Sequence, residues 1–250
     1  MSAGSTAAAN WAQCFPQRFR EIYSKHGLLE GLSAPELKKL KATFHDLIWR
    51  SSRRNGGKQM LLKSPPQTGR LRMLLAMYPN AKFVFIRRDP YEVFKSNQKL
   101  WETFRDQNFQ DFSAAEADEH ILWSYSRIHE KFEQDRWLCK PGQLTELTFE
   151  DFQQDPVKAL EQVYRELGLG SFESVRGRFE SYVKAHHKRA RPYELMEVEL
   201  DKVEAALGPW LTAWNYHRNP PPVPLFRRPR AWAPAEGSAA DDHLHYSQTA

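Results

Sequence analysis

The sequence is poor in cysteine and has no long apolar run. Cys14 and Cys139 are the two cysteines among its 250 residues. This excludes a disulfide framework and a cysteine-based metal cluster, so we expect no metal and a reducing, cytoplasmic compartment. The apolar runs are far shorter than the ~20 residues that a helix needs to cross a bilayer, which argues against a membrane span. The first residues also lack the basic and apolar regions of a secretory signal.

The charge is moderately positive and unevenly distributed. Lys and Arg outnumber Asp and Glu, 36 against 31, which gives a net charge of +5. This charge permits an anionic partner such as nucleic acid, a membrane surface or a phosphorylated small molecule, and does not choose among them. The clearest arginine cluster (Arg227, Arg228 and Arg230) lies in the C-terminal tail, and acidic residues are interleaved on most predicted helices. We therefore expect no nucleic-acid partner.

Composition divides the chain into a folded part and a tail. Hydrophobic residues make up 41% and charged residues 27%, which is ordinary for a globular domain with a sizeable core. Residues 219–250 are rich in proline and lack apolar periodicity, which predicts a disordered extension. We expect a single α/β domain over residues 1–218 and a Pro/Arg-rich tail over 219–250.

Capping residues and helical spacing predict the helices. Ser33 and Glu36 form a capping box before apolar residues at helical spacing. Asp89 and Asp155 each precede a proline, as an N-cap precedes the first helical residue. Further helices are predicted at about 113–137, 171–186 and 195–214.

Three short apolar segments are predicted as strands: residues 59–63, 81–86 and 144–149. Segment 81–86, AKFVFI, is apolar throughout, which is typical of a strand buried on both faces of a parallel sheet. Strands that alternate with helices over short links indicate an α/β domain. We expect one three-layer α/β unit whose sheet contains all three strands, with the first two as parallel neighbours.

The stretch FVFIRRDPYEVFKS places two arginines where such a sheet binds ligands. Arg88 lies at the carboxyl end of the second predicted strand. The helix that follows should present unpaired N–H groups, and Ser96 shares a face of it with Glu92. An arginine, a helix N-terminus and a hydroxyl together suit a phosphate or sulfate group. Alternatively, Arg87 and Arg88 pair with surface carboxylates such as Asp89, and Ser96 faces solvent.

The longer segment LLKSPPQTGRLRMLLAMYPNAKFVFIRRDPYEVFKS, residues 61–96, resembles the core of the bacterial-type sulfotransferases that use 3′-phosphoadenosine 5′-phosphosulfate (PAPS). The similar features are Lys-Ser-Pro, then a helix, an apolar strand, and Arg-Asp-Pro with a serine eight residues after the arginine. Looser similarity continues through residues 147–169 and 187–195. The resemblance implies a P-loop-like sulfotransferase fold with a helix-rich C-terminal half.

The resemblance also implies roles for individual residues. Arg88 and Ser96 would bind the 3′-phosphate of PAPS, and Lys63 would neutralise negative charge on the sulfuryl group and the bridging oxygen, because sulfuryl transfer depends on positioning and charge stabilisation. The alternative for Lys63 is an exposed lysine at the end of a strand. A basic run that would extend the phosphate clamp, or else be a solvated face, comprises Lys188, Arg189 and Arg191.

The sequence departs from the family's pattern at the position of the base. Many relatives have a histidine where this chain has Gln67, and glutamine cannot take a proton from an acceptor hydroxyl. The general base is therefore unassigned. His45 and His120 are candidates, and the alternative is that each has only a structural role.

A second departure concerns the 5′-phosphosulfate loop. The family's basic Ser-Gly-Thr-Thr loop should lie upstream of Lys63. Gly4-Ser5-Thr6 is only weakly similar to it and lacks the basic residue, and Gly57-Lys58 lacks the P-loop spacing. We expect an N-terminally incomplete fold, in a chain that is either truncated or degenerate, with an unpaired sheet edge that invites self-association. If the coding region begins at Met1, we expect weak nucleotide binding and little turnover.

Two functions follow from the resemblance. The first is sulfuryl transfer from PAPS to a hydroxyl or amine on a small-molecule or glycan acceptor. The second is a non-catalytic sulfotransferase remnant that binds a nucleotide or a protein partner.

The register of the motif yields a first prediction. Arg88→Ala should weaken binding of 3′-phosphoadenosine 5′-phosphate by more than Arg87→Ala, because Arg88 directly precedes Asp-Pro. A hydrogen-bonded charge contact to phosphate contributes roughly 1.5–3 kcal/mol, against a few tenths for an exposed arginine. Titration calorimetry on both variants measures the difference, and equal losses would mean that the motif match is accidental.

Overall fold

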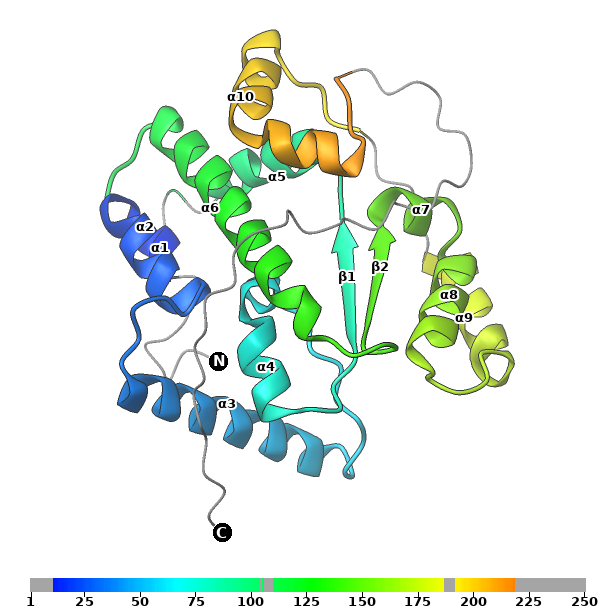
Figure 1. The fold of residues 1–250 in the computed structure, drawn as a ribbon. Coiled ribbons are helices and arrows are strands. Elements are labelled where there is room, and N and C mark those ends of the chain that lie inside the picture. The colour runs from blue at the N-terminus through cyan, green and yellow to red at the C-terminus, as the bar shows by residue number, and fades with distance from the viewer. Residues whose placement is uncertain (1–10, 104, 106–109, 187–191, 219–250) are drawn as a thin grey trace. The chain divides into compact units, whose positions relative to one another are not determined.

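The computed structural model describes residues 11–103, 105, 110–186 and 192–218 (Figure 1). The tail expected over residues 219–250 and the Gly4-Ser5-Thr6 segment lie outside these residues. The longer helices are α3 (Ala34–Arg54), α5 (Pro90–Thr103), α6 (Ala114–Asp135), α8 (Pro156–Leu167), α9 (Glu173–His186) and α10 (Glu197–Trp214). Shorter ones are α1 (Trp11–Cys14), α2 (Phe19–Ile22), α4 (Leu71–Met77) and α7 (Phe149–Gln154). Among the described residues, no helix has both the length and the apolar character needed to cross a bilayer.

The helix starts expected from the sequence are confirmed. Ser33 caps α3: its backbone N–H donates to Glu36 Oε2 at 2.8 Å, and the Glu36 N–H donates to Ser33 Oγ at 3.4 Å. Asp155 caps α8 through the Lys158 N–H at 3.0 Å. Each cap satisfies an N–H group that has no partner within its own helix.

Two of the three predicted strands form a parallel pair. β1 (Phe83–Arg87) pairs with β2 (Leu144–Thr148) in a continuous register that runs from Phe83 opposite Leu144 to Arg87 opposite Thr148. Figure 1 shows the two arrows side by side and pointing the same way. The chain is therefore a helix-rich α/β protein with a small parallel sheet.

The strand predicted at 59–63 is wrong. These residues form neither helix nor strand, and Leu61 is 93% exposed. Pro65 begins the 3₁₀ helix η3 (Pro65–Arg70) directly after this segment. A short apolar run is typical of a strand, but a strand also needs a neighbouring strand to pair with its backbone groups. The sheet of the described residues consists of β1 and β2, so residues 59–63 have no such partner in it.

The two faces of the sheet are covered unequally. Phe85 stacks on Phe132 of α6 with ring centroids 4.1 Å apart, and Leu147 packs into a cluster on α8. Val84 and Ile86, which point to the same face as Leu147, are 41% and 52% exposed. One half of that face is therefore open over β1. Self-association through an unpaired sheet edge stays a prediction.

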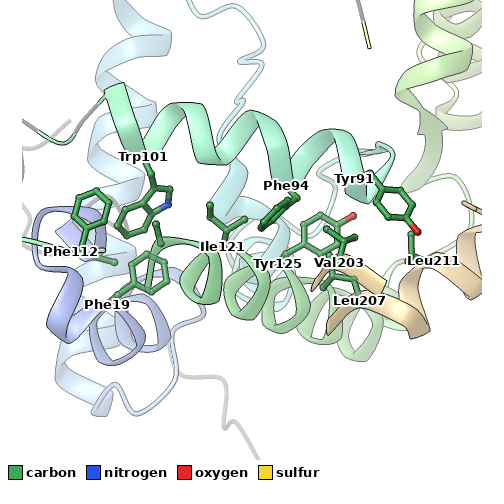
Figure 2. Packing of buried hydrophobic residues seen from close by; sticks show 12 residues of the cluster. Phe19, Tyr91, Phe94, Trp101, Phe112, Ile121, Tyr125, Val203, Leu207 and Leu211 are labelled. Atoms are coloured by element: carbon green, nitrogen blue, oxygen red, sulfur yellow. The ribbon is translucent and has the colours of Figure 1, made fainter. Parts of the chain in front are cut away.

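The main core fixes helix α5. Phe94 and Trp101 of α5 pack against side chains from α2, α6 and α10 (Figure 2). The partners that Figure 2 labels include Phe19, Ile121, Tyr125, Val203, Leu207 and Leu211. Because Phe94 is 1% exposed and Trp101 is also buried, this face of α5 cannot rotate without opening the core.

The core yields a stability prediction. Phe94→Ala should lower the free energy of unfolding by about 3–5 kcal/mol, because it removes a buried ring and leaves a cavity. Leu100→Ala on the same helix is the control: Leu100 is 39% exposed, so its loss should be under about 1 kcal/mol. Urea unfolding of both variants measures the two values, and similar losses would contradict the packing described for α5.

Candidate anion site at the carboxyl end of the sheet

The parallel pairing brings the ends of β1 and β2 to one edge. Arg87 is the last residue of β1 and Thr148 the last of β2, and they are opposite each other in the register. The segment after β1 then bonds to the helix after β2, because the Asp89 N–H donates to Glu150 Oε1 at 3.0 Å. This edge holds the arginines that the sequence singles out, in the place where parallel sheets bind ligands.

Arg87 and Arg88 have different surroundings. Arg87 shares a side of β1 with Phe85, which packs towards α6 and α10. The guanidinium of Arg88 instead lies over the ring of Phe149 at 4.5 Å and donates from Nη2 to Glu92 Oε2 at 3.2 Å. Arg88 therefore does pair with a carboxylate, but the carboxylate is that of Glu92 and not that of Asp89.

Both arginines retain a buried donor without an acceptor. Nε of Arg87 and Nε of Arg88 are buried, and within the described part of the chain neither has a hydrogen-bond partner. A buried charged donor that lacks an acceptor is costly, and such groups in native proteins usually meet a ligand, an ion or a water. Because adjacent side chains point to opposite faces, the two donors do not share one pocket, and the Nε of Arg88 is the one beside Phe149 and Glu92.

Ser96 is placed to contribute a hydroxyl. It is half-buried on α5, and its hydroxyl makes no hydrogen bond to the residues that the structure describes. It lies one turn beyond Glu92, the residue that holds Arg88.

The start of α5 is already capped. Asp89 accepts the Tyr91 N–H at 2.9 Å, so the expectation that this helix offers its first N–H groups to a ligand is corrected. The N-cap carboxylate occupies that position and balances the positive end of the helix dipole. Burial, together with the nearby Glu150 carboxylate, raises the pKa of Asp89 to about 6.

Lys63 is not brought into this cluster. It is exposed in the irregular segment before η3, and it makes no hydrogen bond or ion pair with the described residues around Arg88. Because residues 59–63 do not form a strand, Lys63 does not lie at the end of one. Leu61 and Leu62, which precede Lys63, are also exposed.

The histidines named as candidate bases have structural surroundings. His45 Nδ1 lies 3.0 Å from the hydroxyl of Tyr78, and His120 stacks on Phe19 at 4.5 Å. Burial lowers the pKa of His120. Each ring is thus held against an aromatic neighbour.

Sequence reasoning missed His26, which lies beside η3. Arg70 of η3 donates to the backbone oxygens of His26 and Gly27. Gln67 and Arg70 stand on one side of this 3₁₀ helix, three residues apart. Both Gln67 Oε1 and His26 Nδ1 are buried without a partner in the described residues. No local signal could have found the bonds from Arg70 to His26 and Gly27, because they join segments more than 40 residues apart.

The basic run Lys188, Arg189 and Arg191 lies outside the described residues, but the chain directly after it is anchored on α5. The Tyr193 N–H donates to Glu92 Oε1 at 2.8 Å. Lys99 Nζ lies 4.3 Å from the centre of the Tyr193 ring. In the described ranges there is no group of three His, Cys, Asp or Glu side chains that could hold a metal ion.

Comparison with known proteins gives the class. Residues 5–174 match the model of the sulfotransferase family, so the chain belongs to the sulfotransferase family. The bacterial-type resemblance read from residues 61–96 is thereby confirmed.

Two curated relatives carry the same name, omega-hydroxy-beta-dihydromenaquinone-9 sulfotransferase Stf3, from Mycobacterium bovis and Mycobacterium tuberculosis. Each is 30% identical over 209 residues, which is 83% of this chain and 53% of the relative. The chain thus spans about half the length of the curated relatives it matches. No solved structure matches the chain.

The raised pKa of Asp89 yields a prediction on pH dependence. Between the unfolded value near 3.8 and the folded value of about 6, the folded chain binds more protons, so the Asp89 contribution to stability falls as pH rises. Asp89→Asn keeps the N-cap acceptor and removes this penalty. The free energy of unfolding of the variant, relative to the wild type, should rise by roughly 1–2 kcal/mol as the pH goes from 4 to 7, after allowance for partial exposure. Thermal unfolding across this range measures it, and parallel pH profiles would contradict the assignment.

Proposed function

We propose that this chain transfers a sulfuryl group from PAPS to an acceptor, and that the carboxyl end of β1 binds the 3′-phosphate of this co-substrate. The observation that carries the proposal is the buried Nε donor of Arg88, which has no partner in the described residues, in a chain of the sulfotransferase family. An anion with several acceptor oxygens satisfies such donors better than water does, because each bond is charge-assisted.

Arg88 and Ser96 are the proposed phosphate ligands. The Arg88 guanidinium is held between the Phe149 ring and Glu92, so little conformational freedom is lost when an anion binds. The Ser96 hydroxyl has no partner among the described residues and can donate to a second phosphate oxygen. Lys188, Arg189 and Arg191 would extend this clamp.

Lys63 is the proposed catalytic residue. In the transfer, the acceptor oxygen forms a bond to sulfur while the bond from sulfur to the 5′-phosphate oxygen breaks, and the proton of the acceptor hydroxyl passes to solvent water. Negative charge grows on the leaving oxygen, and the Lys63 ammonium would stabilise it. Gln67 Oε1, a buried acceptor without a partner in the described residues, can orient an acceptor hydroxyl but cannot take its proton.

For the acceptor we propose a hydroxyl carried by an apolar small molecule. The name of the mycobacterial relatives gives a hydroxylated menaquinone as the acceptor of those proteins. In this chain, Leu61 and Leu62 are exposed immediately before Lys63, and an apolar molecule would cover them.

A non-catalytic remnant that binds a nucleotide or a protein partner is the second candidate. The observation in its favour is that Lys63 makes no hydrogen bond or ion pair with the described residues of the Arg88 cluster. Binding without transfer would support this reading.

Binding and turnover separate the two functions. We expect the chain to bind 3′-phosphoadenosine 5′-phosphate more tightly than adenosine 5′-phosphate, and to transfer sulfuryl from PAPS to a hydroxylated quinone. Lys63→Ala should lower the transfer rate about 100-fold and leave nucleotide affinity unchanged, since its charge acts on the leaving oxygen. Lys58→Ala, another exposed lysine of the same segment, is the control.

The outcomes are distinct. A preference for the 3′-phosphate without transfer supports the remnant. Equal affinities for the two nucleotides contradict the proposed phosphate site, and equal rates for the two lysine variants contradict the role of Lys63.

A further inference from the structure

Glu92 bonds two segments that are far apart in the sequence. Its Oε2 accepts from Arg88 Nη2 at 3.2 Å, and its Oε1 accepts from the Tyr193 N–H at 2.8 Å. The Glu92 side chain is 17% exposed, so these bonds are shielded from solvent. One carboxylate thus connects the arginine after β1 to the chain that directly follows residues 188–191.

The surroundings of Glu92 extend this connection along α5. Residues Glu92, Ser96 and Lys99 follow at spacings of four and three, so they lie on one face of the helix. Tyr193 contacts both ends of this face, through its N–H at Glu92 and its ring at Lys99. Ser96 therefore lies on the part of α5 that the 192–196 segment approaches.

The direction in which Arg88 is held also matters. Glu92 engages Nη2, while Nε stays buried without a partner in the described residues. The Phe149 ring supports the flat face of the guanidinium. A guanidinium fixed by a carboxylate on one side and an aromatic ring on its face presents its remaining donors in one orientation.

We propose that Glu92 is a positioning residue for the 3′-phosphate site. It orients Arg88 towards the phosphate, and its second oxygen is held by the Tyr193 N–H. This inference rests on the proposed function. A carboxylate near a phosphate can also repel it. If Glu92 positions Arg88, removing its charge should lower the affinity for the 3′-phosphate, whereas if repulsion dominates, the affinity should rise.

The test compares two nucleotides that differ in the 3′-phosphate. Glu92→Gln keeps the length of the side chain and an acceptor for the Tyr193 N–H, but loses the charge that holds Arg88. Its affinity for 3′-phosphoadenosine 5′-phosphate should fall about tenfold, and its affinity for adenosine 5′-phosphate should stay unchanged. Asp46→Asn is the matched control, because Asp46 bonds Arg50 at 2.8 Å in an i, i+4 pair on α3, away from the site.

A double-mutant cycle distinguishes positioning from general damage to the fold. If Glu92 acts through Arg88, Glu92→Gln should cause at most a small further loss in an Arg88→Ala background. A purely structural role would lower the affinity for both nucleotides and would add to the effect of Arg88→Ala. Should Glu92→Gln unfold, Glu92→Asp replaces it: the charge remains, but the shorter side chain cannot span both partners, so selectivity for the 3′-phosphate should still fall.

Three results would overturn the inference: an unchanged affinity of Glu92→Gln for 3′-phosphoadenosine 5′-phosphate, a higher affinity, or a full additional loss in the Arg88→Ala background. If the wild-type chain itself shows no preference for the 3′-phosphate, the proposed function fails, and the inference fails with it.

Discussion

The parallel pairing of β1 with β2 is the constraint on which the candidate site depends. Arg88 and Phe149 are about 60 residues apart in the sequence, yet the guanidinium lies 4.5 Å from the ring, because the two strands end at the same edge. The bond from the Asp89 N–H to Glu150 joins the segments that leave the sheet. A change of register by one residue would move Arg88 to the other face and separate these groups.

Helix α5 transmits the rigidity of the core to this edge. One face of the helix is buried with Phe94 and Trp101, and an ion pair from Lys95 to the buried Glu199 at 2.5 Å connects it to α10. The neighbouring face carries Glu92 and Ser96. Because the core fixes how the helix is rotated, it also fixes where these two side chains point, which is how binding sites on regular elements gain precision.

The electrostatics of the site leave room for an anion in spite of its carboxylates. Asp89 is used as a helix cap, and Glu150 accepts from the Asp89 N–H and the Tyr216 hydroxyl. Burial and the Glu150 charge raise the pKa of Tyr216, as expected where carboxylates gather out of water. With its acids engaged elsewhere, this edge leaves the Nε donors of both arginines without an internal acceptor in the described part of the chain.

The sequence by itself determined the elements whose signals are local. The caps of α3 and α8 depend on side chains within three residues of the helix start, and the segments around 81–86 and 144–149 read as strands from their own composition. The family was likewise readable from the order of short motifs between residues 61 and 96. Only the tertiary structure decided that 59–63 is not a strand and that Glu92 joins Arg88 to Tyr193. The last contact spans 101 positions, and no local pattern encodes it, because it exists only once the sheet and the core have placed α5.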